Sequence, residues 1–326
     1  MVWYHDESIF YAHDRRKIRW VHVSEMAKPY AKGEGQSYMI SDFVSADYGW
    51  LCSADGQESA CVELKPGKNR DGYFTNDEVL EQVTVAINLA RKLYPNDDHA
   101  FVFDNATTHS KRAEDALSAR NLPKKTSKPG KNWMLKVKRR TADHRVVTDS
   151  TGTALMDRIY MGDTCLPDGR PQPVYYPPDH PTHPGLFKGM AILLEERGYP
   201  NAGKLRAECK GFKCAKNGEG EYIGNCCCRR VLFESPDFKN VPSLLTSLCD
   251  AFGVQALFLP KFSPELNPIE QCWGFAKRKY REFPPSSTLE DLVQNTHDVL
   301  ASVPLDSIRK YVFLLNSPDN MTHSFI

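Results

Sequence analysis

The feature that most constrains this chain lies near its C-terminus, where an apolar stretch gives way to a proline-rich corner and then to a helical pattern. Residues 258–273 read Phe-Leu-Pro-Lys-Phe-Ser-Pro-Glu-Leu-Asn-Pro-Ile-Glu-Gln-Cys-Trp. The apolar residues predict a strand that the prolines end, and a proline at the first helical position is typical of a helix start. The pattern therefore places Glu270 in the first turn of a helix that follows closely on a strand.

Two other acids also follow apolar or aromatic runs. Residues 101–109 read Phe-Val-Phe-Asp-Asn-Ala-Thr-Thr-His, with Asp104 after the apolar run, and residues 3–11 read Trp-Tyr-His-Asp-Glu-Ser-Ile-Phe-Tyr, with Asp6. Acids at the ends of three such segments predict a magnesium site, because Mg²⁺ prefers hard oxygen ligands and keeps several waters. Taken singly, each acid is equally well explained as a turn residue or as a carboxylate that stabilises a helix start.

In the same order, the three segments resemble the catalytic signatures of the mariner-type DDE transposases, which are Asp-Glu-Ser, Asp-Asn-x-x-x-His and Ser-Pro-x-Leu-Asn-Pro-Ile-Glu. The resemblance covers about residues 1–109 and 241–326. It implies a ribonuclease-H-like α/β fold with a mixed sheet flanked by helices. It also implies a DNA endonuclease and strand-transferase that uses two Mg²⁺ or Mn²⁺ ions. Asp6 would bridge both ions, and Asp104 and Glu270 would each complete the shell of one.

The periodicity along the chain predicts the same α/β order of strands, helix, strand, helix, strand and helix. Thr75, with Glu78 three residues later, predicts a capped amphipathic helix that ends near Pro95. Alternating or short continuous apolar runs predict the strands. The expected strands are residues 1–4, 17–23, 37–42, 60–64, 100–103 and 254–259, and the other expected helices are 186–197, 241–253 and the one after Pro268.

The distance between the second and third acids departs from the plain mariner-type pattern. Asp104 and Glu270 are separated by 270 − 104 = 166 positions, whereas the resemblance implies a few tens of residues. A structureless loop of this length is uncommon in a compact domain. We therefore expect residues 1–109 and 241–326 to form the catalytic core, and residues 110–240 to form an inserted, independently packed subdomain.

The inserted segment begins with a strongly basic run, residues 123–145, which holds nine Lys or Arg against one acid, Asp143. Such a run favours an anionic partner, and a phosphate-binding arm, a nuclear import signal and a solvated loop all remain open. Trp133 within it is a weaker candidate for stacking on a base. The basic residues are Lys124, Lys125, Lys128, Lys131, Lys136, Lys138, Arg139, Arg140 and Arg145, of which Lys138, Arg139 and Arg140 are the candidate DNA contacts.

Residues beside the acids extend the candidate site. His109 either contacts a phosphate or orients water in the cleft, or it caps a helix start. Asn267 is expected to hold the turn that aims Glu270. Lys277 and Arg281 share a helical stripe with Glu270, so they either reach DNA phosphates or remain solvated surface charges.

Five cysteines fall between positions 209 and 228. As thiolates, Cys209 and Cys214 with two of the three adjacent cysteines would give a tetrahedral zinc site, for which we take Cys226 and Cys228. An H-x-x-H pair, His180 and His183, offers alternative ligands. The other interpretation is that these cysteines are small, buried apolar residues.

The composition restricts the class of protein. A hydrophobic share of 41% and a net charge of +1 are ordinary for a globular chain of 326 residues. No apolar run approaches the ~18–20 residues of a membrane span, and the N-terminus does not resemble a signal peptide. Ten cysteines are too few for a disulfide scaffold of this length. We expect an intracellular protein, and a nuclear one if its partner is DNA.

Together these features predict the catalytic region of a DDE transposase that acts on transposon ends or target DNA, with a homodimer as one expected assembly. Only five residues precede Asp6. We therefore expect either a truncated or separately encoded core, with a separate DNA-recognition domain or protein, or recognition of DNA by the insertion or by a partner. Two alternative functions stay open. One is a domesticated, non-catalytic DNA-binding or scaffold protein, and the other is a nuclease without transposition activity.

Overall fold

The computed structural model describes residues 1–14, 23–24, 33–141, 146–224 and 226–315. The chain divides into two compact units, which are described separately. The first comprises Met1–Lys111 with Ser243–Ile326, and the second comprises Arg112–Pro242. Where the chain leaves and re-enters the first unit, the backbone N–H of Leu244 donates to the carbonyl oxygen of Lys111 at 2.8 Å. Among the described residues, no helix is long and apolar enough to cross a membrane.

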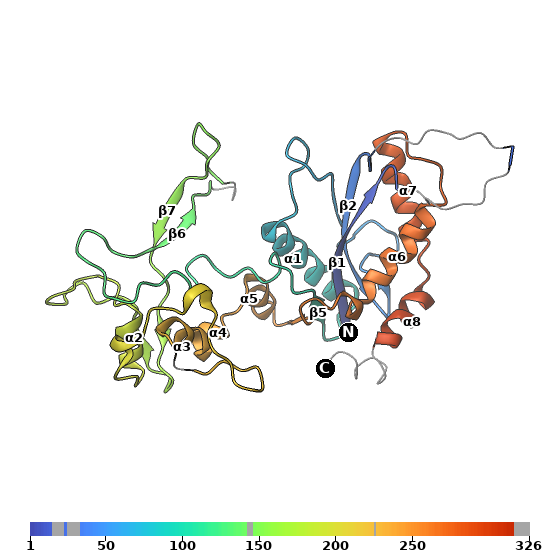
Figure 1. Ribbon diagram of the computed structural model, residues 1–326. Helices are drawn as coiled ribbons and strands as arrows, with labels where there is room; N and C mark the ends of the chain where they lie inside the picture. Colours follow the sequence, from blue (N-terminus) through green and yellow to red (C-terminus); the bar gives the residue numbers. More distant parts are fainter. Residues whose placement is uncertain (15–22, 25–32, 142–145, 225, 316–326) are drawn as a thin grey trace. The chain divides into compact units, whose positions relative to one another are not determined.

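A six-stranded mixed sheet forms the centre of the first unit (Figure 1). Its strands follow the order β10-β5-β1-β2-β3, with β4 also paired to β2. β1 runs antiparallel to β2 and parallel to β5, which is in turn parallel to β10. This is the ribonuclease-H-like arrangement that the sequence predicts. The strands are β1 Val2–Tyr11, β2 Ser37–Ser45, β3 Gly49–Trp50, β4 Val62–Leu64, β5 Ala100–Phe103 and β10 Gln255–Phe258.

The first strand is longer than the sequence predicts, and Asp6 lies within it, not at its end. β2 pairs with β1 from Tyr4 to Tyr11, and this ladder satisfies the backbone beyond the acid. The polar residues that suggested a strand end are therefore accommodated inside a paired strand. The strand expected at 17–23 lies outside the described residues apart from Val23, which is in a turn.

Helices cover both faces of this sheet (Figure 1). α1 Asn76–Leu93 begins at the predicted capping box of Thr75 and Glu78, and α5 Leu244–Ala251 is capped by Ser243. Together they bury one core, which includes Val83, Phe101 and Leu245. A second core includes Ile40, Trp273 and Ile308, and it lies under α6 Pro268–Tyr280, α7 Leu289–Ala301 and α8 Leu305–Leu315.

The second unit has its own core, in which Phe187, Met190 and Leu232 are fully buried. Its helix α2 is Met190–Glu196, shorter than the expected 186–197. The reason is Gly189, which has a φ of 89°. A Cβ at this position would lie 2.5 Å from the carbonyl carbon of Lys125, so the chain passes tightly there before the helix begins.

The other elements of the second unit are short. β6 Leu135–Lys138 and β7 Met156–Ile159 form an antiparallel pair, as do β8 Thr164–Cys165 and β9 Pro171–Gln172. The remaining helical segments here are η1 Ala202–Lys204, η2 Lys210–Phe212, α3 Cys228–Glu234 and α4 Pro236–Lys239, while η3 Pro264–Leu266 belongs to the first unit.

Candidate active site

Asp6, Asp104 and Glu270 line one cavity of about 300 Å³ in the first unit. Asp6 lies on β1, Asp104 follows directly after the neighbouring parallel strand β5, and Glu270 lies in the first turn of α6. Adjacent strands of the sheet thus carry the two aspartates, and the helix start adds the glutamate. The structure brings the three predicted acids together.

Burial and mutual repulsion act on two of these carboxyl groups. Asp6 is buried, and its Oδ2 accepts a hydrogen bond of 3.0 Å from the indole Nε1 of Trp273. Burial, with Glu270 and Glu7 nearby, raises the pKa of Asp6 to about 8. Burial also raises the pKa of Glu270, against the opposing effect of Lys277. Negative charge is therefore crowded at this cavity, which suits it to a cation.

Asn267 fixes the corner that carries Glu270. Its side chain is 1% exposed, and its Nδ2 donates to the carbonyl oxygen of His5 on β1 at 3.0 Å. The Asn267 carbonyl in turn accepts from the backbone N–H of Glu270 at 3.1 Å. With Pro268 at the first helical position, the start of α6 is tied to the central strand, and Asn267 has the positioning contacts expected of it.

His109 lies between two carboxylates. Its fully buried ring places Nδ1 2.5 Å from Asp104 Oδ1 and Nε2 3.3 Å from Glu7 Oε1. Burial alone would lower the pKa of His109, but Asp104 and Glu7 raise it to about 10. The same contact and the backbone N–H of Ala106 hold the pKa of Asp104 below its usual range despite partial burial. His109 is therefore a buried cation that orients Asp104.

Glu7 and Asp6 leave β1 on opposite faces, since Glu7 contacts His109 while Asp6 contacts Trp273 on α6. His5 shares the face of Glu7 and packs edge-on against His109, with ring centroids 5.2 Å apart. Burial lowers the pKa of His5 to about 4. The ligand atoms of His5, Glu7 and His109 lie within 4.8 Å of one another. Of the three residues, His109 is the one that contacts Asp104.

The two basic residues predicted on α6 differ in their surroundings. Lys277 is half-buried, with its Nζ 5.6 Å from the centroid of the Phe10 ring, and burial lowers its pKa. Arg281 is exposed and forms an ion pair with Asp14, with Nε 2.9 Å from Oδ1. Lys277 is thus close enough to affect Glu270, whereas Arg281 already has an acidic partner.

The basic candidates of the second unit are partly engaged by acids. Arg139 contacts Asp157 at 2.6 Å, and Arg140 lies 3.8 Å from Glu114. Lys138 is exposed on β6, which leaves its charge available to an anion. Trp133, the weaker candidate for base stacking, packs against Phe187 at the core of the second unit. Arg145 lies outside the described residues.

Four cysteine sulfurs of the second unit lie close together. They belong to Cys209, Cys214, Cys226 and Cys227, and all lie within 4.8 Å of one another. The choice of Cys228 in place of Cys227 is wrong, because Cys228 opens α3 with its sulfur directed at the carbonyl oxygen of Ala202, 3.4 Å away. The alternative ligands His180 and His183 pack on Tyr176 instead.

Phe262 is a candidate site residue that the sequence did not single out. It lines the carboxylate cavity, is 89% exposed and has a φ of 66°. A large side chain rarely adopts this left-handed conformation without a structural or functional reason. In the sequence, the feature that could have identified Phe262 is its position between Pro260 and Pro264, in the proline-rich corner before α6.

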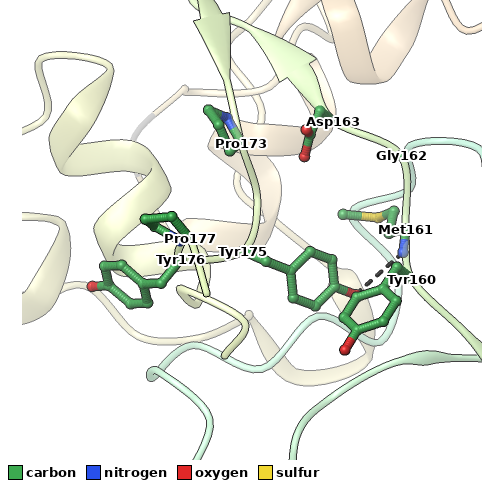
Figure 2. A pocket seen from close by; sticks show the side chains of 8 residues that line it. All are labelled: Tyr160, Met161, Gly162, Asp163, Pro173, Tyr175, Tyr176 and Pro177. Carbon is green, nitrogen blue, oxygen red and sulfur yellow. Dashed lines mark hydrogen bonds between the residues drawn. The ribbon is translucent and has the colours of Figure 1, made fainter. Parts of the chain in front are cut away.

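A second hollow, of about 640 Å³, lies in the second unit and contains none of the predicted site residues (Figure 2). Tyr160 and Tyr175 form part of its wall with their rings nearly perpendicular, and the Tyr175 hydroxyl accepts a hydrogen bond of 3.2 Å from the backbone of Met161. Asp163 is the charged residue of its lining. The tyrosines are thus already engaged in packing and hydrogen bonding within the unit.

No curated protein matches this chain. Among solved structures, the Mos1 mariner paired end complex with Mn is similar over 98% of this chain and 53% of its own, with 9% identity and a TM-score of 0.45. The Mos1 transposase paired-end complex with left transposon end is similar over 34% of this chain and 30% of its own, with 19% identity and a TM-score of 0.27. This chain spans about half the length of the first of these.

A family model matches one segment of the chain, residues 243–293, and its description is DDE superfamily endonuclease. The segment contains α5, β10 and α6, and with them the proline corner and Glu270. Asp6 and Asp104 lie outside the match and join Glu270 through the fold. Over residues 243–293, this chain is similar to the DDE superfamily of endonucleases.

Proposed function

We propose that this protein is a metal-dependent DNA endonuclease and strand-transferase, the catalytic region of a mariner-like DDE transposase. One observation carries the proposal: Asp6, Asp104 and Glu270, from three segments far apart in the sequence, line a single cavity. Glu270 lies within residues 243–293, the segment that is similar to DDE superfamily endonucleases, which supports the proposal. The sequence motifs around the other two acids resemble the remaining signatures of the same transposases.

The cavity fits Mg²⁺ or Mn²⁺. Its three acids offer the hard oxygen donors that these ions prefer. The raised pKa values of Asp6 and Glu270 show that their ionised forms are disfavoured there, and a bound cation would stabilise these ionised forms. Asp104 uses Oδ1 for His109 and Ala106, so Oδ2 remains for a ligand. When bound, such ions activate the attacking oxygen and stabilise the leaving oxygen of a phosphodiester.

The protein's own side chains prepare this site. His109 keeps Asp104 ionised and fixes its orientation, while the indole N–H of Trp273 fixes one oxygen of Asp6. Asn267 anchors the helix start that carries Glu270 to the backbone of β1. Positioning of this kind matters because displacement at phosphorus depends chiefly on geometry and on stabilising developing charge.

The proposed substrate is DNA, at transposon ends or at a target site. Lys277 beside the cavity and the exposed Lys138 of the second unit are the basic residues that we assign to phosphate contacts. We further propose a nuclear location, for which the basic run at 123–145 would serve as an import signal, and a homodimer that pairs two DNA ends. Residues 110–240 would then be an insertion into the catalytic core.

A plasmid-nicking assay tests the catalytic proposal. Supercoiled DNA is incubated with the purified chain in Mg²⁺, in Mn²⁺ or in EDTA, and the conversion to nicked circles is followed. We expect nicking with either metal, none in EDTA, and a loss of at least about 10²-fold in Asp104→Asn, because a carboxylate proposed to hold the metal is removed. A labelled oligonucleotide with a free 3′ end, added to the same reaction, reports strand transfer.

Glu81→Gln is the matched control, since Glu81 is an exposed acid on α1 away from the cavity. It should nick at the wild-type rate. Equal activity of Asp104→Asn and wild type would refute the catalytic role of the triad. DNA binding without metal-dependent nicking would instead support the non-catalytic scaffold, and nicking without joining would support a nuclease.

A further inference from the structure

We propose that Cys209, Cys214, Cys226 and Cys227 form a structural zinc site that holds the second unit together. The four sulfurs lie within 4.8 Å of one another. This inference is independent of the nuclease proposal, because the cysteines belong to the second unit and the acids to the first. The zinc content and the DNA-nicking activity can therefore be tested separately, and failure of one test leaves the other proposal standing.

The spacing of the sulfurs fits one tetrahedral ion. A zinc–sulfur bond of ~2.3 Å places the four sulfurs of a tetrahedron about 3.8 Å apart. Cys227 Sγ lies 3.9 Å from Cys214 Sγ and 3.9 Å from Cys226 Sγ. A disulfide would require about 2.05 Å. The group is therefore wide enough for a single ion at its centre and too compact for a multi-iron cluster, whose thiolates surround several metal atoms.

The backbone presents the four thiols from two tight segments. Cys209 and Cys214 flank η2, where Gly211 and Phe212 both have left-handed backbone conformations, with φ of 61° and 58°. Cys227 is the N-cap residue of α3 and is fully buried. The left-handed turn reverses the first segment so that both of its sulfurs approach the second.

This stretch has few buried side chains of its own. Among the described residues of 203–227, Cys214 and Cys227 are the ones that are buried. Leu205 and Ala207 pack against the core of the second unit, but the rest of the segment buries little apolar surface and gains little from the hydrophobic effect. A metal bound by four thiolates supplies the missing stabilisation, as in small domains whose fold depends on zinc.

The surrounding charges suit a thiolate site. Four thiolates on one Zn²⁺ carry a net charge of −2, which nearby cations stabilise. The Arg230 guanidinium stacks on Phe212 and Tyr222, 3.8 Å and 3.6 Å from their ring centroids, and donates to the carbonyl oxygen of Phe212. It is thus held against the turn between Cys209 and Cys214.

Metal analysis of the full-length chain, purified without a metal-affinity tag, tests this site. We expect about one zinc per chain after gel filtration, and a visible absorption band of tetrahedral cobalt thiolate after exchange with Co²⁺. Cys214→Ser and Cys227→Ser should each lower the zinc content at least about tenfold. Cys228→Ser is the matched control, because it removes the neighbouring thiol that faces Ala202, and it should retain zinc.

A measurement on the wild-type chain covers the case in which the serine variants do not fold. Removing zinc with a chelator should expose the lysines and arginines of 204–216 to trypsin, and adding zinc back should restore protection, while cleavage of the first unit stays unchanged. Zinc below about a tenth of an atom per chain would overturn the proposal. So would bound iron in place of zinc, a Cys214–Cys227 disulfide in the purified chain, or equal zinc loss in Cys228→Ser and Cys227→Ser.

Discussion

Replacing His109 by glutamine tests whether a buried positive charge holds the candidate active site together. The histidine lies between Asp104 and Glu7, fully buried, with its pKa raised to about 10. Glutamine keeps an N–H donor of similar reach but cannot carry the charge. Two partly buried carboxylates would then lose their common cation, so the folded state should lose stability.

The size of the loss depends on pH in a defined direction. A pKa that rises from 6.5 to about 10 on folding corresponds to an upper limit of about 5 kcal/mol at ~1.36 kcal/mol per pH unit. Because the folded pKa is the higher one, this stability is fully present below pH 6.5 and is lost as the pH rises towards 10. At pH 9 at most about 1.4 kcal/mol of it remains, so the cost of the substitution should fall by up to about 3 kcal/mol between pH 6 and pH 9.

Urea denaturation of wild type and His109→Gln at pH 6 and pH 9 measures this difference, with EDTA present so that no metal competes for Asp104. His99→Gln is the matched control. His99 is also a buried histidine of the first unit, but it contacts Trp3 and the carbonyl oxygen of Tyr94 in place of a carboxylate. A cost of His109→Gln that is the same at both pH values, or that changes with pH as His99→Gln does, would refute the buried-cation argument.

Two further experiments test the positioning of Glu270 and the binding of DNA by the second unit. Asn267→Ala should lower the free energy of unfolding by about 1–3 kcal/mol in urea denaturation, because it removes the buried hydrogen bond to the His5 carbonyl. Asn105→Ala is the control at an exposed position of the same cavity. It should change the free energy of unfolding by less than about 0.5 kcal/mol. In the second unit, replacing Lys136 and Lys138 together by Gln should weaken DNA binding for all sequences and flatten its dependence on salt in a filter-binding titration, since both side chains are exposed on β6. A salt slope equal to that of wild type would assign these lysines another role.

The sequence predicted best where local chemistry decides the structure. Thr75 and Glu78 form the predicted capping box, and the apolar run at 100–103 forms a central strand of four residues. The proline corner begins α6 at Pro268. In each case the signal lies within a few residues of the element that it specifies, so neighbouring segments were not needed to interpret it.

What the sequence missed depends on contacts between distant segments. β1 continues past Asp6 because β2 pairs along it, and nothing in the polar residues after Asp6 reveals that partner. Arg139 is paired with Asp157, eighteen positions away on the adjacent strand. The choice between Cys227 and Cys228 depended on where α3 begins, because one residue along the chain changes which way a side chain points.

The backbone hydrogen bond between Leu244 and Lys111 explains how Asp104 and Glu270 can be far apart in the sequence and still line one cavity. The two ends of the interruption meet within the first unit, so the core spans the gap in one bond whatever number of residues lies between. The number of residues between Asp104 and Glu270 therefore reflects the length of the inserted segment and does not determine the arrangement of the carboxylates in the cavity. Chains that differ widely in this spacing can present the same arrangement of carboxylates, and a search that fixes the interval will overlook them.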